Sequence, residues 1–180
     1  EHDALCAMLR RAGAEVVYHD EALPEHADSI FVFDPALVTD HGAILMQMGK
    51  RLRQGEEAAM AKMFEKLEVP ILARLSGEAH GEAGDMLWLD GRTLVVGQGF
   101  RTNAEAARQI RAALAPHGIS VMTAELPYYT GPEACLHLLS VISIVDSGVA
   151  VVYRPLLPVP LFLELERRGM RLVDVPDEEF

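Results

Sequence analysis

Five short strings of this chain carry carboxylates, guanidinium groups and one imidazole. In chain order they are residues 28–34 (DSIFVFD), 51–53 (RLR), 82–85 (EAGD), 101–103 (RTN) and 136–138 (LHL). Charged donors and acceptors of these types together suit a small cationic amino acid as ligand. None of the strings supplies a convincing nucleophile. The sequence therefore indicates a substrate-binding cage that does not contain its attacking atom.

The first string offers two carboxylates, Asp28 and Asp34, six positions apart. On the strand that we expect at 29–33, an even separation places both on one face. Two carboxylates on one face raise each other's pKa unless they meet a cation, and a guanidinium group can satisfy both through paired N–H donors. The alternative, which the spacing alone favours, is that both cap the ends of a strand in solvent.

The third string supplies Glu82 and Asp85. Gly81 and Gly84 allow the backbone to approach a ligand closely, so Glu82 could bind a substrate nitrogen or orient a base. The alternative is an ordinary acidic loop. His80 stands beside these carboxylates, but no second histidine lies nearby at a ligand spacing, so we expect no metal and no cofactor.

The remaining strings supply two arginines and a histidine. Arg53 and Arg101 could hold an α-carboxylate as bidentate donors, although a surface arginine is the commoner case. His137 lies in an apolar string, where a histidine is more often a core residue than a general acid and base. Cys135 could pair with His137 on one strand face, but adjacent side chains leave little room for a substrate carbon.

The elements that would position these strings recur about every 50 residues, which is the scale of a supersecondary repeat. A helix ends near a glycine or a turn and a short apolar strand follows, at about 14–18, 70–73, 119–122 and 170–173. Two strand candidates precede each later helix: 29–33 and 43–46, 86–89 and 93–97, and 138–145 and 149–153, with helices at 56–67, 103–114 and 161–168. Such β-β-α-β units must stack in a line or around an axis, and a closed ring would gather their strand ends around one pocket.

Composition favours one globular domain over residues 1–180, because half of the residues are hydrophobic. The net charge of −11 argues against nucleic acid as a partner. No apolar run is long enough to cross a bilayer, and the residues after Glu1 do not resemble a signal peptide. We therefore expect a cytoplasmic protein in which Cys6 and Cys135 are free thiols.

Taken together, the five strings resemble the guanidino-group-modifying superfamily, the penteins. The similarity is greatest to dimethylarginine dimethylaminohydrolases and smaller to arginine deiminases and amidinotransferases, and it extends from about residue 27 to residue 180. It implies an α/β propeller of β-β-α-β modules with pseudo-fivefold symmetry, here incomplete at both ends. An incomplete ring leaves an unpaired strand edge, which favours association, for example as a homodimer.

The resemblance also implies roles for single residues. His137 and Glu82 would be catalytic, and the substrate would be bound by Asp28, Asp34, Arg53 (with Arg51 as the neighbouring alternative), Arg101 and Asp85. A thiolate would attack the guanidinium carbon, and His137 would protonate the departing amine and then activate water to release citrulline. Residues 175–180 resemble the segment that leads to the family's nucleophilic cysteine, which we expect a few residues beyond Phe180. Without that cysteine the chemistry should fail.

The expected function is hydrolysis of a C–N bond of arginine or a methylated arginine, a small-molecule substrate. Phe33 stands where relatives often carry a polar residue, which could change the substituted arginine that fits. The alternatives are an arginine deiminase, an amidinotransferase, a non-catalytic propeller that only binds, and a thiol enzyme that uses Cys135 with His137. A scaffold would need neither Glu82 nor His137, which argues against the non-catalytic alternative.

Overall fold

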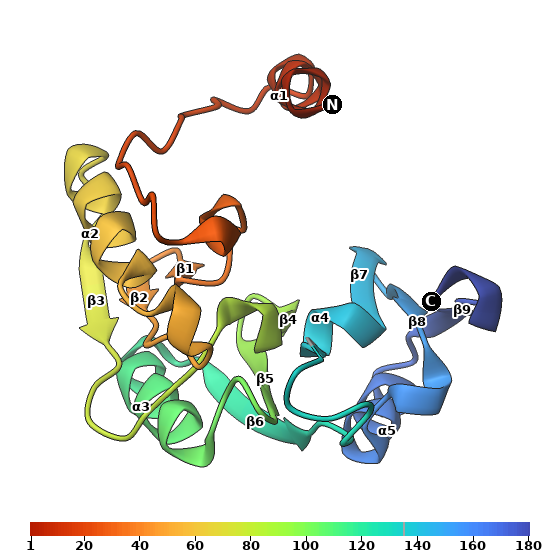
Figure 1. Ribbon diagram of the computed structural model, residues 1–180. Coiled ribbons are helices and arrows are strands. Elements are labelled where there is room, and N and C mark those ends of the chain that lie inside the picture. The colour runs from red at the N-terminus through yellow and green to blue at the C-terminus, as the bar shows by residue number, and fades with distance from the viewer. Residues whose placement is uncertain (135) are drawn as a thin grey trace.

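The computed structural model describes residues 1–134 and 136–180, and it contains three small mixed sheets (Figure 1). The first module has β1 (Ala36–Thr39), β2 (Gly42–Leu45), α2 (Glu56–Lys66) and β3 (Ile71–Arg74). The second has β4 (Met86–Asp90), β5 (Thr93–Gln98), α3 (Ala104–Leu114) and β6 (Ser120–Glu125). The third has β7 (Ile142–Asp146), β8 (Val149–Val152), α5 (Val159–Arg167) and β9 (Arg171–Asp174).

Shorter elements connect these modules. The α-helices α1 (His2–Arg11) and α4 (Leu138–Val141) precede the first and third sheets. The 3-10 helices are η1 (Ala27–Ile30), η2 (Arg51–Arg53), η3 (Ala83–Asp85), η4 (Ala115–His117), η5 (Arg154–Leu156) and η6 (Asp177–Glu179). Four of these short elements, η1, η2, η3 and α4, carry or adjoin the residues that the sequence singled out.

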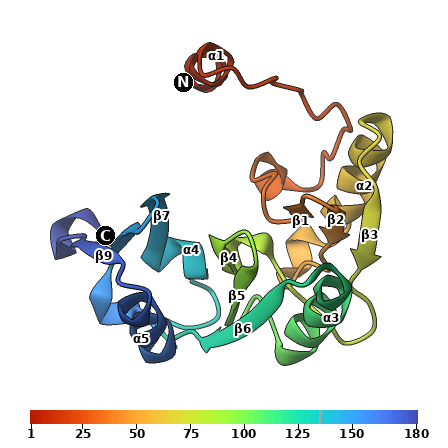
Figure 2. The same ribbon diagram turned by 180° about the vertical axis from the view of Figure 1, so that it is seen from behind.

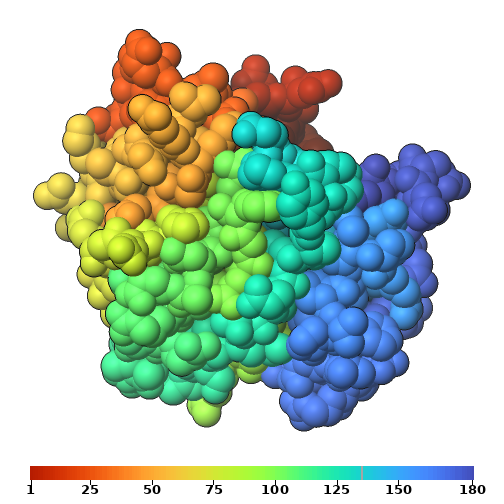
Figure 3. All heavy atoms as spheres, turned by 60° about the horizontal axis from the view of Figure 1, so that its bottom comes forward, coloured from red at the N-terminus to blue at the C-terminus, as the bar shows by residue number. Residues whose placement is uncertain are grey.

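The predicted β-β-α-β repeat is confirmed in all three modules. In each sheet the first strand runs antiparallel to the second, and the second runs parallel to the third after the helical crossover. The three modules lie side by side in chain order (Figure 3). The α/β fold is therefore established, whereas the ring of five modules stays a prediction.

Two apolar cores lie between successive modules. The strands of the second module contribute to both cores, because successive side chains point to opposite faces of a sheet. Leu94 and Val96 of β5 pack with the first module, together with Ile110 of α3. Val95, between them in sequence, packs with the third module, together with Leu161 of α5. These cores fix the positions of the loops at the strand ends relative to one another.

Three strand predictions differ from the structure: two of the strands are absent, and one begins later than predicted. Residues 29–33 form no strand in the described structure, because η1 covers their start. The carbonyl of Asp34, which follows them, accepts from Ala83 N–H at 2.9 Å instead of pairing with a strand. The argument that Asp28 and Asp34 share a strand face therefore fails. The strand predicted at 138–145 begins only with β7, because the N–H groups of His137 and Leu138 bond to the side chains of Ser140 and Asp85 and start α4 instead.

The third difference concerns the strand predicted at 14–18, which is wrong, because these residues are irregular in the structure. This segment belongs to the long connection between α1 and η1, and Figures 1 and 2 show α1 apart from the three sheets. Ion pairs hold the connection against α2: Lys62 lies 2.9 Å from Glu21, and Lys66 lies 2.7 Å from Asp20.

Among the described residues, none of the helices has the length and apolar character that a membrane crossing needs.

Candidate active site

A buried cluster of three titratable side chains forms where the first two modules meet the start of α4. Glu82 precedes η3, His137 precedes α4, and Asp34 precedes β1. One ligand-type atom from each of the three lies within 4.8 Å of the others, and all three residues are buried. Segments far apart in the sequence thus converge at one point.

Glu82 and His137 form the closest pair of this cluster, with 2.9 Å between Glu82 Oε2 and His137 Nε2. An ionised carboxylate can only accept, so the imidazole must carry hydrogen on Nε2. The other carboxylate oxygen, Oε1, accepts from Lys50 N–H at 2.8 Å. Burial acts to raise the pKa of Glu82, but the bonds from His137 and Lys50 and the charge of Arg101 outweigh it and lower the pKa below its ordinary value. Glu82 is therefore suited to orient and stabilise a protonated imidazole.

Asp85 is fully buried beneath this pair. Its Oδ2 accepts from the Thr102 hydroxyl at 2.6 Å, and its Oδ1 accepts from Leu138 N–H at 2.9 Å. Burial raises the pKa of Asp85 to about 6, although His137 and both hydrogen bonds oppose the change. Because Leu138 follows His137, Asp85 fixes the backbone that carries the imidazole.

Arg53 lies in a buried ion network. Its NH1 lies 2.5 Å from Asp34 Oδ2, its NH2 lies 2.6 Å from Glu56 Oε2, and its Nε also donates to Glu56. NH2 further donates to the carbonyl of Phe31. Burial lowers the pKa of Arg53, but the bonds to Glu56 and Asp34 prevail and hold it above its ordinary value. Arg53 thus positions Asp34. The other carboxylate oxygen of Asp34, Oδ1, accepts from Gly84 N–H at 3.0 Å.

Gly84 is the point at which these groups touch. A Cβ added there would lie 2.4 Å from His137 Nδ1 and 2.9 Å from Asp34 Oδ1. Any side chain would therefore displace the imidazole. The sequence suggested that Gly84 allows a ligand to approach the backbone closely, whereas in the structure the imidazole of His137 lies against it.

The more exposed part of the site consists of Asp28, Lys50 and Arg101. Asp28 Oδ2 lies 2.5 Å from Lys50 Nζ, and this hydrogen bond lowers the pKa of Asp28, with smaller contributions from the charges of Arg53 and Arg101. Arg101 Nε is buried and finds no hydrogen-bond acceptor among the described residues. This part of the site thus contains a carboxylate, an ammonium group and a guanidinium N–H donor for which the described residues supply no acceptor.

The cluster of Asp34, Glu82 and His137 is also the set of donors among the described residues that could hold a metal ion. Asp34 is already bonded to Arg53, and Lys50 and Arg101 add positive charge beside Glu82 and Asp28. A divalent cation would be repelled by these neighbours. A monovalent guanidinium suits the cluster better, because its planar N–H groups match carboxylate oxygens. His80, the sequence's metal candidate, lies 2.9 Å from the Asn103 amide nitrogen.

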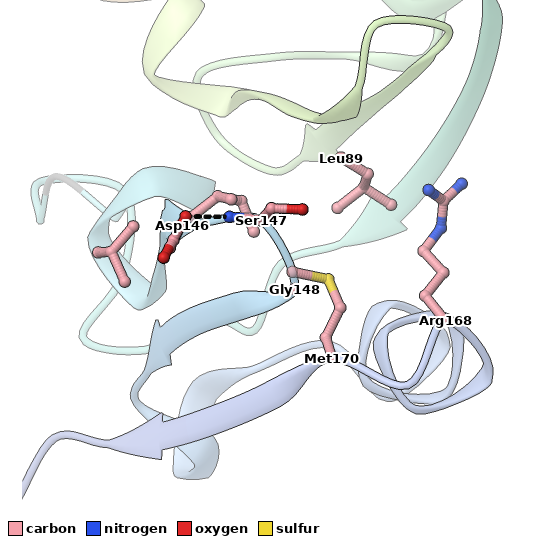
Figure 4. A pocket seen from close by; sticks show the side chains of 8 residues that line it. Leu89, Asp146, Ser147, Gly148, Arg168 and Met170 are labelled. Atoms are coloured by element: carbon pink, nitrogen blue, oxygen red, sulfur yellow. Dashed lines mark hydrogen bonds between the residues drawn. The ribbon is translucent and has the colours of Figure 1, made fainter.

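A separate pocket lies at the opposite ends of the strands (Figure 4). Leu89, Arg168, Met170 and the β7–β8 turn at 146–148 line it. None of the predicted site residues contributes to it, and Arg168 is held by Asp90 and Glu164. The chemistry that the sequence predicts therefore does not coincide with this pocket.

The structure thus brings together Asp34, Glu82, Asp85 and His137, and it places Asp28 and Arg101 beside them. Arg53 is bonded to Asp34, to Glu56 and to the Phe31 carbonyl. Sequence reasoning missed Lys50, Glu56 and Thr102. Glu56 stands three residues after Arg53, a helical ion-pair spacing that could have revealed it, whereas no sequence signal marked Lys50. Cys135 lies outside the described residues, so its pairing with His137 is untested.

The α/β fold of this chain is similar to that of solved dimethylarginine dimethylaminohydrolase structures. Residues 23–168 match the arginine deiminase family, and the chain belongs to that family, within the pentein superfamily.

Curated relatives agree with this assignment. The N(G),N(G)-dimethylarginine dimethylaminohydrolase of Pseudomonas aeruginosa is 28% identical over 99% of this chain. The enzyme of the same name from Streptomyces coelicolor is 30% identical over 98%. The chain spans 65% and 62% of these two relatives' lengths. A solved structure of the Pseudomonas aeruginosa enzyme, a mutant complexed with citrulline, superposes with a TM-score of 0.71, covering 86% of this chain and 56% of that one.

Proposed function

We propose that this protein hydrolyses a C–N bond in the guanidinium group of arginine or a methylated arginine, releasing citrulline and ammonia or an amine. The observation that carries the proposal is the buried contact of Asp34, Glu82 and His137 around Gly84. Two similar proteins are named dimethylarginine dimethylaminohydrolases, and one such structure holds citrulline. We propose further that the three modules belong to a pseudo-fivefold propeller, whose strand ends surround the substrate.

In this proposal Asp34 and Glu82 accept N–H bonds from the substrate guanidinium in a site that largely excludes water, where such bonds are strongest. A thiolate, expected outside residues 1–180, attacks the guanidinium carbon. His137 protonates the departing nitrogen, aided by Glu82, which stabilises the imidazolium form. The neutral imidazole then removes a proton from water, which attacks the covalent intermediate and yields citrulline.

The charge balance of the site supports a cationic ligand. Among the described residues, carboxylates outnumber the lysine and arginine cations at the site. The carboxylates are those of Asp28, Asp34, Glu56, Glu82 and Asp85, and the cations are Lys50, Arg53 and Arg101. A bound guanidinium would reduce this negative excess without a metal ion.

The test is an activity assay on the protein as its whole gene encodes it. Purified protein is incubated with L-arginine, monomethylarginine and asymmetric dimethylarginine, and citrulline is measured together with ammonia or the released amine. We expect stoichiometric release with at least one substrate and loss of release in His137→Ala. If no guanidino compound yields citrulline, the proposed hydrolase activity is refuted.

The same assay separates the alternatives within the superfamily. Faster turnover of arginine than of the methylated substrates would identify an arginine deiminase. Transfer of the amidino group to glycine, with ornithine as the second product, would identify an amidinotransferase.

A further inference from the structure

The hydroxyl group of Thr102 joins two residues of the candidate active site. Thr102 follows Arg101 in the connection between β5 and α3, and it is fully buried. Its Oγ1 accepts from Glu82 N–H at 3.1 Å and donates to Asp85 Oδ2 at 2.6 Å. A single hydroxyl group thus bonds to the first and the last residue of the string at 82–85, and the proposed reaction gives it no role.

The chemistry of the partners fixes the direction of both bonds. A backbone N–H can only donate, so Glu82 uses the Thr102 oxygen as its acceptor. The hydroxyl hydrogen then points to Asp85, whose ionised carboxylate can only accept. The other carboxylate oxygen of Asp85 accepts from Leu138 N–H at 2.9 Å. A connected set of hydrogen bonds therefore links the backbone of Glu82 to the backbone that follows His137.

These bonds hold the two residues whose side chains form the closest pair of the cluster. Glu82 Oε2 and His137 Nε2 lie 2.9 Å apart, and general acid–base catalysis depends on such a distance. Both side chains are buried, so the pair keeps this distance only while the two backbones keep their separation. Thr102 bridges that separation, because one of its bonds is to the Glu82 backbone and the other holds the carboxylate that fixes Leu138.

The packing around Thr102 favours one orientation of its side chain. Its methyl group lies beside Gly81, where an added Cβ would be 3.6 Å from Thr102 Cγ2. A Cβ added to Gly97 would lie 3.4 Å from Asp85 Oδ1 and 2.9 Å from Leu138 Cβ, so these groups pack against backbone that carries no side chain. Turning the Thr102 hydroxyl away would deprive a buried N–H and a buried carboxylate of this partner, which is costly.

We propose that Thr102 is a positioning residue of the active site, which holds Glu82 and His137 at the separation that proton transfer requires. In this role it acts through the Glu82 backbone and through Asp85 rather than on the substrate. The inference rests on the proposed function for its effect on turnover, and on the geometry alone for its effect on the imidazole. A threonine that merely stabilises the fold would change neither kcat nor the environment of His137.

The experiment compares the full-length wild type with Thr102→Val, which has nearly the same shape without the hydroxyl, and with Thr102→Ser, which keeps it. The matched control is Thr39→Val. The Thr39 hydroxyl also donates to a carbonyl and accepts from an N–H, those of Gly42 and His41, but it lies at the β1–β2 turn, at the opposite end of the strands. With a substrate that releases citrulline, Thr102→Val should lower kcat about 10- to 100-fold, the cost of a displaced catalytic group, and should leave KM close to that of wild type.

The position of the imidazole is measured separately by NMR. The nitrogen chemical shifts of the His137 ring are read through its carbon-bound hydrogens and assigned by their loss in His137→Ala. Thr102→Val should shift the Nε2 signal, because the bond to Glu82 changes, whereas Thr102→Ser should restore the signal and most of kcat. Thr39→Val should leave both at their wild-type values. This measurement needs no turnover, so it decides the inference even if no guanidino compound yields citrulline.

An unchanged Nε2 signal in Thr102→Val overturns the inference, whatever happens to stability or to kcat. A kcat that stays at the wild-type value in an active enzyme overturns it as well. If Thr102→Val does not fold, Thr102→Cys takes its place, because a thiol is a weak donor and a weak acceptor. Thr102→Cys should shift the same signal and lower kcat, and wild-type values of both would overturn the inference.

Discussion

Replacing Asp85 by asparagine should stabilise the protein at neutral pH. Asp85 is fully buried, and its two oxygens contact the Thr102 hydroxyl and Leu138 N–H. Asparagine has the same shape: its carbonyl can accept from Leu138, and its amide can donate to the Thr102 oxygen. The substitution therefore removes the charge and keeps the bond from Leu138 N–H, while the Thr102 hydroxyl, which also accepts from Glu82 N–H, changes from donor to acceptor toward residue 85.

The magnitude follows from the raised pKa. Burial moves the pKa of Asp85 from 3.8 to about 6. A folded-state pKa above the unfolded one means that ionisation costs folding free energy: the cost is absent below about pH 4, grows as the pH rises, and is complete above about pH 6. Two pH units at 1.36 kcal/mol each correspond to about 3 kcal/mol. Asp85→Asn should be more stable than wild type by up to about 3 kcal/mol at pH 7.5 and about equal at pH 4.

The assay is urea denaturation at several pH values between 4 and 8, for wild type, Asp85→Asn and two controls. Asp85→Ala leaves Leu138 N–H and the Thr102 hydroxyl without partners, so it should be less stable than Asp85→Asn at every pH. Asp90→Asn removes a carboxylate at the far end of β4 whose pKa is lowered by Arg168, so its pH dependence should have the opposite sign. An Asp85→Asn variant that is less stable than wild type at pH 7.5 by a pH-independent amount would refute the reasoning.

Three further predictions concern the buried cluster. Gly84→Ala should lower kcat at least about 100-fold, the typical worth of a general acid–base, because the new methyl group displaces His137; circular dichroism should show retained secondary structure, and unchanged kcat would contradict the predicted clash. Arg53→Met should destabilise the protein by about 3–5 kcal/mol, as expected when a buried carboxylate loses its partner; a loss below about 1 kcal/mol in urea denaturation would show that Asp34 does not depend on it. Glu82→Gln should lower kcat about 100-fold or more with a smaller effect on stability, and a variant that retains wild-type citrulline release would remove Glu82 from the mechanism.

Much of the fold could be predicted from the sequence because periodicity and turns are local signals. The Asp90-Gly91 turn and the helix that follows Asn103 were both predictable, and Asn103 caps α3 through a bond from Ala106 N–H at 2.9 Å. The segment 29–33 could not be read in this way. Its apolar residues suggest a strand, but Phe31 and Phe33 are exposed, and the following carbonyl pairs with η3 of the next module.

The site was only partly predictable, for a related reason. Residue types revealed the carboxylates and His137, because such groups stand out in apolar surroundings. Which charge meets which depends on contacts between modules. The sequence marked Arg53 as a substrate donor but could not reveal its buried partners Asp34 and Glu56. Lys50 gave no signal because a lysine before a basic string is ordinary.

The carboxylates of the site also link the modules, which makes the chemistry depend on the architecture. Asp34, from the segment leading into the first module, accepts from Gly84 N–H ahead of the second. Glu82, from the segment leading into the second module, accepts from Lys50 N–H of the first module. Asp85, from the same segment, accepts from Leu138 N–H in the segment leading into the third module. Each bond joins a side chain of one module to the backbone of another. Substitutions that loosen an intermodule core should therefore lower activity before they unfold the protein, because these bonds, and with them the imidazole, shift first.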